Sequence, residues 1–250
     1  MVKVGILMSD YGHDPSETAI PYAGFKSAGF DIDFITEKGT SPKCDAKMLE
    51  GITQKILGAK QYVITEYNKM ILSEEWKSPS SWSTPGFSLD QYDLVFVPGG
   101  HEKSVRQVID SETVHKLMAD YFPKTKKPAT KAVGAVCHGV MVLSSTKLED
   151  GKSVLHGVKT TALPARFEQL AFWGTRAFLG DYYKTYGACS ENVEESVTKV
   201  LEKPSDFKNS LGMGPFVVED ETYNYVSARF PGDVDLLAEK LVNLARSITA

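Results

Sequence analysis

Four short apolar runs in the first part of the chain are continuous rather than alternating, and turn or helix signals bound each of them. Strands buried on both faces of a parallel sheet show this pattern, whereas a strand with one solvated face alternates. The runs cover residues 2–8, 30–36, 93–98 and 132–136. Residues 15–28 and 111–121 carry apolar positions at helical spacing and connect successive strands. Strands that alternate with helices predict an α/β fold with a doubly wound, mostly parallel sheet flanked by helices.

The rest of the chain adds elements around that sheet. Residues 40–58 look helical, residues 78–88 form a loop rich in Ser and Pro, and residues 164–179 form a helix with Pro164 in its first turn. Two more strands at residues 215–218 and 223–227 precede an amphipathic helix over residues 234–246. No linker or internal repeat marks a boundary. We therefore predict one domain over residues 1–250, with residues 40–90 and 164–212 as peripheral decoration that includes a small cap.

Charge and cysteine content narrow the class of partner. The formal net charge is −4, whereas nucleic acids and membrane surfaces attract proteins with a concentrated basic footprint. No stretch approaches the ~18 apolar residues of a membrane span. The three cysteines are an odd number at wide spacings, which argues against a disulfide framework and against a metal knuckle. We expect a cytoplasmic protein with free thiols and a small-molecule substrate, without nucleic-acid or membrane partners.

The segment around Cys137 carries the most specific signal. A buried strand runs into Cys137, and a helix begins at once. Such a sharp turn brings backbone close on both sides of a nucleophile, and the small residues Ala135 and Gly139 stand two positions before and after it. The helix N-terminus is expected to lower the pKa of the thiol and so make it reactive at neutral pH. The alternative is that Cys137 is a small apolar side chain that ends a buried strand.

A second candidate segment, Gly99, Gly100 and His101, follows the strand at residues 93–98. Its glycines could aim a backbone N–H at an oxyanion formed near Cys137, although most Gly-Gly pairs are turns. His101 would border the pocket, or would only bond to backbone. Both segments end at the carboxyl edge of the predicted sheet, where the sites of open α/β sheets lie.

Residues 93–101 and 132–143 together resemble the DJ-1/PfpI superfamily, and the similarity extends in order over most of the chain. In length and in its Cys-His pair the chain resembles the larger Hsp31-like members, which include glutathione-independent glyoxalases. The resemblance implies a flavodoxin-like fold of the class I glutamine amidotransferase type, and a homodimer. It also implies roles for side chains: Cys137 as the nucleophile, His138 as its neighbour in a Cys-His-acid arrangement, and Glu168 as the acid that orients the histidine.

The resemblance gives Glu17 a role as well, as the family glutamate that hydrogen-bonds the cysteine sulfur. Burial and like charge raise the pKa of a carboxyl beside a thiolate, so Glu17 could first donate a proton and then act as a base. Without the family context Glu17 would be an ordinary exposed residue on a helix.

Departures from the family pattern lie around the pocket rather than in the sharp turn at Cys137. Glyoxalase-type members usually follow Gly-Gly-His with Gly and then an aromatic-acid pair, where this chain has Glu102 to Arg106. Near the C-terminus a Gly-Gln-Asn-Pro-like turn is replaced by residues 227–233, which include Arg229, Phe230 and Pro231. These changes put the identity of the substrate in question. Six aromatic residues over 172–186 are interpreted as core or as dimer contact rather than as a ligand cage.

Three functions remain open at this stage. The leading hypothesis is a cofactor-independent, glyoxalase-like lyase: the Cys137 thiolate adds to a small 2-oxoaldehyde such as methylglyoxal, and D-lactate is released. We expect no catalytic metal, because HExxH and paired Cys/His spacings are absent from the sequence, and no nucleotide, because the phosphate-binding motifs are absent too. The alternatives are a stress-response chaperone, deglycase or oxidation sensor that holds unfolded clients, and a hydrolase or hydratase acting on a C–N bond.

Overall fold

A seven-stranded sheet in the order β5-β3-β1-β6-β7-β9-β8 forms the centre of the computed structural model, which describes residues 1–210 and 212–249. All neighbours pair in parallel except β8 and β9, which are antiparallel. The predicted doubly wound, mostly parallel sheet is confirmed. The strands are β1 (Lys3–Leu7), β3 (Asp31–Thr36), β5 (Ser80–Ser81), β6 (Leu94–Val97), β7 (Ala132–Val136), β8 (Val217–Glu219) and β9 (Tyr225–Ala228).

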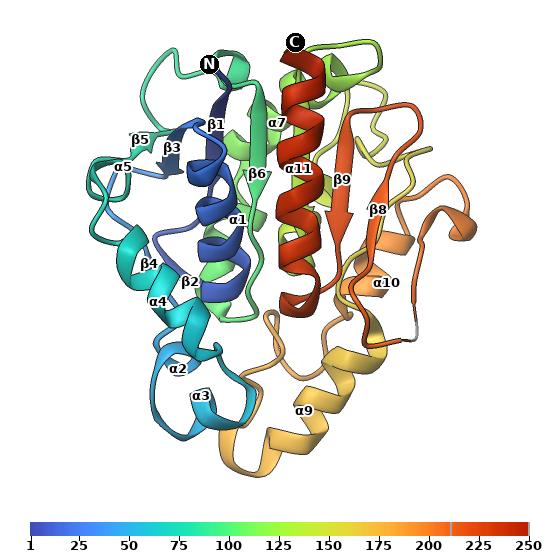
Figure 1. Ribbon diagram of the computed structural model, residues 1–250. Helices are drawn as coiled ribbons and strands as arrows, with labels where there is room; N and C mark the ends of the chain where they lie inside the picture. The colour runs from blue at the N-terminus through green and yellow to red at the C-terminus, as the bar shows by residue number, and fades with distance from the viewer. Residues whose placement is uncertain (211, 250) are drawn as a thin grey trace.

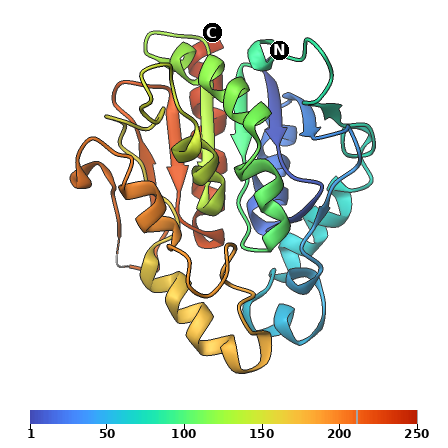
Figure 2. The same ribbon diagram turned by 180° about the vertical axis from the view of Figure 1, so that it is seen from behind.

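Helices cover both faces of the sheet, which explains why its central strands are continuously apolar. Helices α1 (Pro15–Ser27) and α11 (Val234–Thr249) lie on one face (Figure 1). Helices α7 (Glu112–Tyr121) and α8 (Val140–Ser145) lie on the other (Figure 2). Along β6, Phe96 packs with the first pair of helices, while Val95 and Val97 pack with the second. Every residue of β6 and β7 is buried, so neither face of these strands could be polar.

A short two-stranded sheet ties the first loop to the periphery. Strand β2 (Tyr11–His13) pairs with β4 (Lys43–Cys44) directly before α1 begins. The side chain of Asp14 caps α1, since its Oδ1 accepts hydrogen bonds from the amides of Ser16 at 2.7 Å and Glu17 at 3.2 Å. This cap places Glu17 in the first helical turn, at the carboxyl end of β1.

The prediction of one helix over residues 40–58 is wrong. That segment contains β4 and two short helices, α2 (Ala46–Leu49) and α3 (Gly51–Leu57). Asp45 caps α2 through the amide of Lys47, and Gly51 takes a φ of 81°, which a continuing helix does not allow. The remaining helices are α4 (Gln61–Met70), α5 (Glu74–Lys77), α6 (Arg106–Ile109), α9 (Ala165–Leu179) and α10 (Val193–Thr198).

Short 3-10 turns complete the connections, at Leu89–Gln91, Lys103–Val105, Phe122–Thr125, Cys137–Gly139, Pro204–Asp206 and Pro231–Asp233. Helices α2, α3 and α9 gather at the end of the molecule toward which the parallel strands point (Figure 1). Within the described residues, no helix combines the length and apolar character needed to cross a membrane.

Candidate active site

Cys137 stands in a strained turn between β7 and the helical segment that follows. Its φ is 57°, and among the described residues it is the one non-glycine with a positive φ. This left-handed conformation costs free energy for an L-residue and is kept where the surrounding structure enforces it. A Cβ on Gly139 would lie 2.8 Å from the carbonyl oxygen of Pro98 and still closer to that of Val97. The small residue after Cys137 is thus required by the close approach of β6 to the turn.

The Gly99-Gly100 loop approaches the same turn from β6. A Cβ on Gly99 would lie 2.5 Å from Oε2 of Glu17 and 2.7 Å from Cβ of Cys137. Gly100 has a φ of 138°, and a Cβ there would meet the carbonyl oxygen of Gly12 at 2.7 Å. Both glycines therefore permit backbone to pass close to the cysteine and to α1.

Glu17 is fully buried, and its carboxyl group lies beside the thiol of Cys137 and the backbone of Gly99, although neither contact has the geometry of a standard hydrogen bond. Burial, followed by the charge of Asp14, raises the pKa of Glu17 well above its ordinary value. Burial thus favours the neutral, protonated form of Glu17. A protonated carboxyl can donate a proton from one oxygen and accept a proton on the other.

The pKa of Cys137 corrects the expectation drawn from the helix alone. Burial and the neighbouring Glu17 carboxyl raise the pKa of the thiol, and the backbone N–H of His138 only partly opposes them. The regular helix α8 begins at Val140, three residues beyond Cys137, which weakens the field of its N-terminus at the sulfur. The protonated thiol is thus the resting form, and a nearby base must take its proton when it attacks.

His138 provides such a base. Its Nδ1 lies 3.4 Å from Sγ of Cys137. Burial, with smaller contributions from His101 and Lys184, lowers the pKa of His138 to about 3, so the imidazole is neutral at physiological pH. A ring with so low a pKa is a weak base, so it can relay the thiol proton only while that proton passes on to the substrate oxygen.

His101 lies against an aromatic pair rather than against the sulfur. Its ring stacks on Tyr183 with centroids 4.3 Å apart and meets the edge of Tyr182 at 4.6 Å. Its Nε2 has no hydrogen-bond partner among the described residues and lies 4.0 Å from Oδ2 of Asp45. Burial lowers the pKa of His101 to about 3. Tyr183 is buried in a core cluster with Tyr182, as the interpretation of the aromatic stretch predicts, and it also lines the cavity at Cys137.

Glu168 reaches the site but is engaged by other groups. Its Oε1 forms an ion pair of 2.8 Å with Nζ of Lys184, and its Oε2 accepts a hydrogen bond of 2.9 Å from the amide of Val193. Both side chains of the ion pair are buried. In the part of the chain that the structure describes, no hydrogen bond joins Glu168 to His138. Glu168 therefore links α9 directly to α10, rather than to the imidazole of His138 that it was predicted to orient.

A cavity of about 250 Å³ brings most of the predicted residues together. It is lined by Glu17, Gly100, His101, Cys137, His138 and Glu168, along with mostly apolar neighbours. These groups come from α1, from the loop after β6, from the turn after β7 and from α9. Gly99 lies behind this lining, where it makes room for Glu17 and Cys137.

Sequence reasoning missed His13, which shapes the site from behind. Its Nδ1–H donates to the carbonyl of Gly99 at 2.8 Å, while its Nε2 accepts the amide hydrogen of Ser9 at 2.8 Å. Burial lowers the pKa of His13 to about 4, which preserves this neutral tautomer. A histidine at the end of a short strand, directly after Gly12, carries no spacing signal, because both of its partners are backbone groups.

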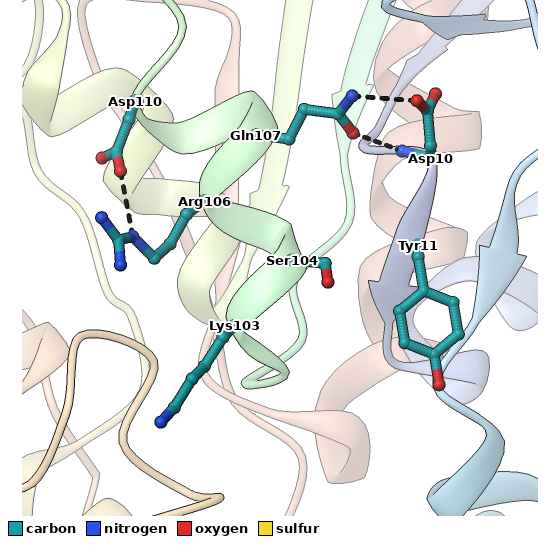
Figure 3. A pocket seen from close by; sticks show the side chains of 7 residues that line it. All are labelled: Asp10, Tyr11, Lys103, Ser104, Arg106, Gln107 and Asp110. Carbon is teal, nitrogen blue, oxygen red and sulfur yellow. Dashed lines mark hydrogen bonds and ion pairs between the residues drawn. The ribbon is translucent and has the colours of Figure 1, made fainter.

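The divergent segment from Glu102 to Arg106 does not line this cavity. Figure 3 shows a separate hollow beside it, where Lys103 and Arg106 lie across from Tyr11 and Asp10. Both cations are already paired, Lys103 with Asp181 at 2.8 Å and Arg106 with Asp110 at 3.2 Å. Among the described residues, no group of three or more His, Cys, Asp or Glu side chains is arranged as a metal site.

A parallel α/β fold that presents a strained cysteine beside a buried glutamate, in a sharp turn between a strand and a helix, defines the class of this protein. A family model described as ThiJ/PfpI family-like matches residues 8–214. The chain belongs to this ThiJ/PfpI family, within the DJ-1/PfpI superfamily, as its resemblance predicted.

Three similar proteins illustrate the range of the family. An uncharacterized protein of Schizosaccharomyces pombe is 28% identical over 249 residues, which cover 98% of this chain and 85% of that protein. The protein/nucleic acid deglycase HchA of Staphylococcus aureus is 29% identical over 167 residues, 65% of this chain and 52% of HchA. The crystal structure of glyoxalase III from Candida albicans has a TM-score of 0.69 and 19% identity, with 97% of each chain covered. At that identity the likeness shows the fold alone.

Proposed function

We propose that this protein converts 2-oxoaldehydes into 2-hydroxy acids without a cofactor, using Cys137 as its nucleophile. The observation that carries the proposal is the fully buried carboxyl of Glu17, which lies beside the thiol of a cysteine held at positive φ. Burial of a carboxyl without an ion pair or a strong hydrogen bond costs free energy, which favours a catalytic reason for its presence. The similarity of the fold to that of glyoxalase III from Candida albicans supports the proposal.

The first step is addition of the thiol to the aldehyde carbon. The S–C bond forms while the thiol proton moves to Nδ1 of His138, 3.4 Å away, and from there to the aldehyde oxygen. The product is a neutral hemithioacetal. Backbone N–H groups near Gly100 and His138 stabilise the negative charge that develops on the oxygen.

The second step moves hydrogen between the two substrate carbons. Glu17 donates its proton to the ketone oxygen through one carboxyl oxygen and takes the C1 proton through the other, which gives an enediol. Return of a proton to C2, with loss of the proton on the C1 oxygen, leaves a thioester of the 2-hydroxy acid. Water hydrolyses the thioester and regenerates the thiol. C1 is oxidised and C2 is reduced, so no external oxidant or reductant is required.

The test is D-lactate formation from methylglyoxal in the absence of glutathione, for wild type, Cys137→Ser and Glu17→Gln. We expect wild type to turn over, and each variant to lose at least about 100-fold in kcat/KM, as loss of a nucleophile or of an acid–base group predicts. Cys189→Ser is the matched control, because Cys189 is exposed and does not line the cavity. Circular dichroism establishes that all four proteins are folded.

Two results would redirect the proposal. If wild type forms no 2-hydroxy acid, yet iodoacetamide labels Cys137 faster than Cys44 and Cys189, Cys137 acts in oxidation sensing or on a C–N bond instead. If Cys137→Ser retains turnover, the nucleophile has been assigned to the wrong residue.

A homodimer and the holding of unfolded clients are further proposals, and an exposed apolar face of α9 favours them. Leu170, Trp173 and Phe178 are 72%, 65% and 61% exposed. Apolar surface of this kind commonly marks an interaction site. We expect a dimer in sedimentation that Trp173→Ser weakens; a monomeric wild type that suppresses aggregation of a denatured client would assign the face to clients.

A further inference from the structure

The cavity at Cys137 has two parts that differ in chemistry: a floor formed by the reactive groups Glu17, Cys137 and His138, and a cover that lies over them. The reactive groups lie together at the carboxyl edge of the sheet, whereas the cover above them is apolar. The cover comes from α2, from α9 and its approach, and from two loops of the C-terminal part of the chain, with Met48, Leu163, Phe167, Ala171, Met213 and Phe230. A substrate held at the sulfur must therefore place its substituent against hydrocarbon.

The size of the cavity exceeds what methylglyoxal would fill. A volume of about 250 Å³ corresponds to roughly eight waters at ~30 Å³ each. The single methyl group of methylglyoxal would leave most of the apolar wall without contact. Each further buried methylene contributes ~0.8 kcal/mol, so a larger apolar substituent gains affinity that the methyl group cannot.

A buried ion pair fixes part of this wall before any substrate arrives. The guanidinium of Arg229 is fully buried and pairs with Asp233 at 2.8 Å. It also donates to the carbonyls of Ser210, Gly212 and Gly214, at 2.9, 3.0 and 2.7 Å. These bonds hold the loop that carries Met213, while the neighbouring Phe230 packs on Phe167 with centroids 5.0 Å apart. The wall is thus preorganised, which lowers the entropic cost of binding.

Charge in the cavity disfavours an anionic substituent. None of its described lining residues is a lysine or an arginine, while Asp14, Glu17 and Glu168 are all carboxyl groups. Two buried cations near the cavity are already paired, Lys184 with Glu168 and Arg229 with Asp233. A carboxylate on the substrate would lose its hydration and find no partner.

Building on the proposed function, we propose that the substrates are 2-oxoaldehydes with an uncharged apolar substituent larger than methyl, a branched alkyl or phenyl group. Methylglyoxal is then a poor substrate of the same chemistry. Met213 and Phe230 act as specificity-determining residues, because they contact the substituent and not the reacting carbons.

The experiment compares kcat/KM for methylglyoxal, isobutylglyoxal, phenylglyoxal and 4-carboxyphenylglyoxal, with the 2-hydroxy acids measured by chiral chromatography. For wild type we expect isobutylglyoxal and phenylglyoxal to exceed methylglyoxal by at least about tenfold, the discrimination that a few methylenes provide. The carboxylated analogue should fall below phenylglyoxal by a similar factor. Met213→Ser and Phe230→Ser should each lower the ratio of isobutylglyoxal to methylglyoxal by about tenfold.

Leu72→Ser is the matched control, since Leu72 is 69% exposed and lies outside the cavity; its ratio should equal that of wild type. Met213 is 70% exposed, so its variant should fold even if Phe230→Ser does not. Turnover of methylglyoxal as good as that of the larger aldehydes, with ratios unchanged in Met213→Ser, overturns the inference and leaves the proposed function intact. Absence of turnover for all four aldehydes overturns both.

Discussion

The floor of the cavity and its cover follow opposite structural rules. On the floor, backbone passes so close to Glu17, Cys137 and His138 that a Cβ would not fit at Gly99, Gly100 or Gly139. The cover is built on α9 and on loops, and α9 leaves large apolar side chains such as Leu170 and Trp173 in solvent. The floor specifies the chemistry through tight packing, whereas the cover can change the accepted substrate without disturbing that chemistry. Insertions and substitutions in loops are tolerated for this reason.

The largest effect we predict comes from breaking the buried ion pair between Lys184 and Glu168 in the cover. Lys184→Met removes the buried cation that pairs with Glu168 and leaves the carboxylate with the amide of Val193 alone. Removing one partner of a buried pair typically costs about 3–5 kcal/mol, because an uncompensated charge remains. We expect that loss in the free energy of unfolding, measured by urea denaturation at pH 7.

The double variant Lys184→Met with Glu168→Gln separates charge from packing. It should recover most of the lost stability, since no buried charge is then unpaired. A cost below about 1 kcal/mol for Lys184→Met alone would mean that the pair is solvated, and that α9 and α10 are held by apolar contact.

Two Gly-to-Ala substitutions, one in the floor and one in the cover, test the comparison between these two regions. Gly139 has a φ of −59°, which any residue adopts, so Gly139→Ala is costly only through contact with the carbonyls of Val97 and Pro98. Overpacking of this kind costs about 1–3 kcal/mol. Gly174, inside α9, has nothing within 4 Å of an added Cβ, so Gly174→Ala should stabilise by roughly 0.5–1 kcal/mol.

Thermal unfolding of the two variants gives the sign of each change directly. Opposite signs support a rigid floor and a permissive cover. Equal, small effects at both positions would show that the turn after β7 can relax, and that its small residues are not required by space.

The floor could be predicted from the sequence because its signals are local. A continuous apolar run into Cys137, with Ala135 and Gly139 at fixed offsets, predicts both the strand and the turn that follows. The helices at residues 15–28 and 234–246 were likewise predictable from spacing, and the structure confirms them as α1 and α11.

The cover could not be predicted, because its residues meet only in three dimensions. Met48, Phe167, Met213 and Phe230 are far apart in the chain, and no spacing relates them. From the sequence alone Tyr183 is interpreted as core, and only the structure reveals that His101 stacks on it. The electrostatics were predicted only in part: burial raises the pKa of Glu17 as expected, but it also raises that of Cys137, where the helix was expected to dominate.

The effect that we predict to be smallest at neutral pH concerns His101, which stands where floor and cover meet. In the folded protein burial lowers its pKa to about 3, whereas an unfolded histidine titrates near 6.5. Below pH 6.5 the unfolded state therefore binds a proton that the folded state excludes, and the stability contributed by the neutral ring is lost as pH falls toward 3. His101→Phe keeps the stacking on Tyr183 and removes this titration. Asp45, 4.0 Å from Nε2, and Lys47 are the charged groups nearest to the ring.

As the solution is acidified, the free energy of unfolding of His101→Phe should therefore increase relative to that of wild type. Between pH 6 and pH 4 the difference should grow by about 1.4 kcal/mol for each pH unit at most, and less where water reaches the ring, which is 13% exposed. Between pH 7 and pH 8 it should stay constant, because neither state changes its protonation at this residue. A difference that is flat down to pH 4 would mean that the folded protein accepts a proton on His101, with Asp45 as its partner, and that the boundary between floor and cover is open to water.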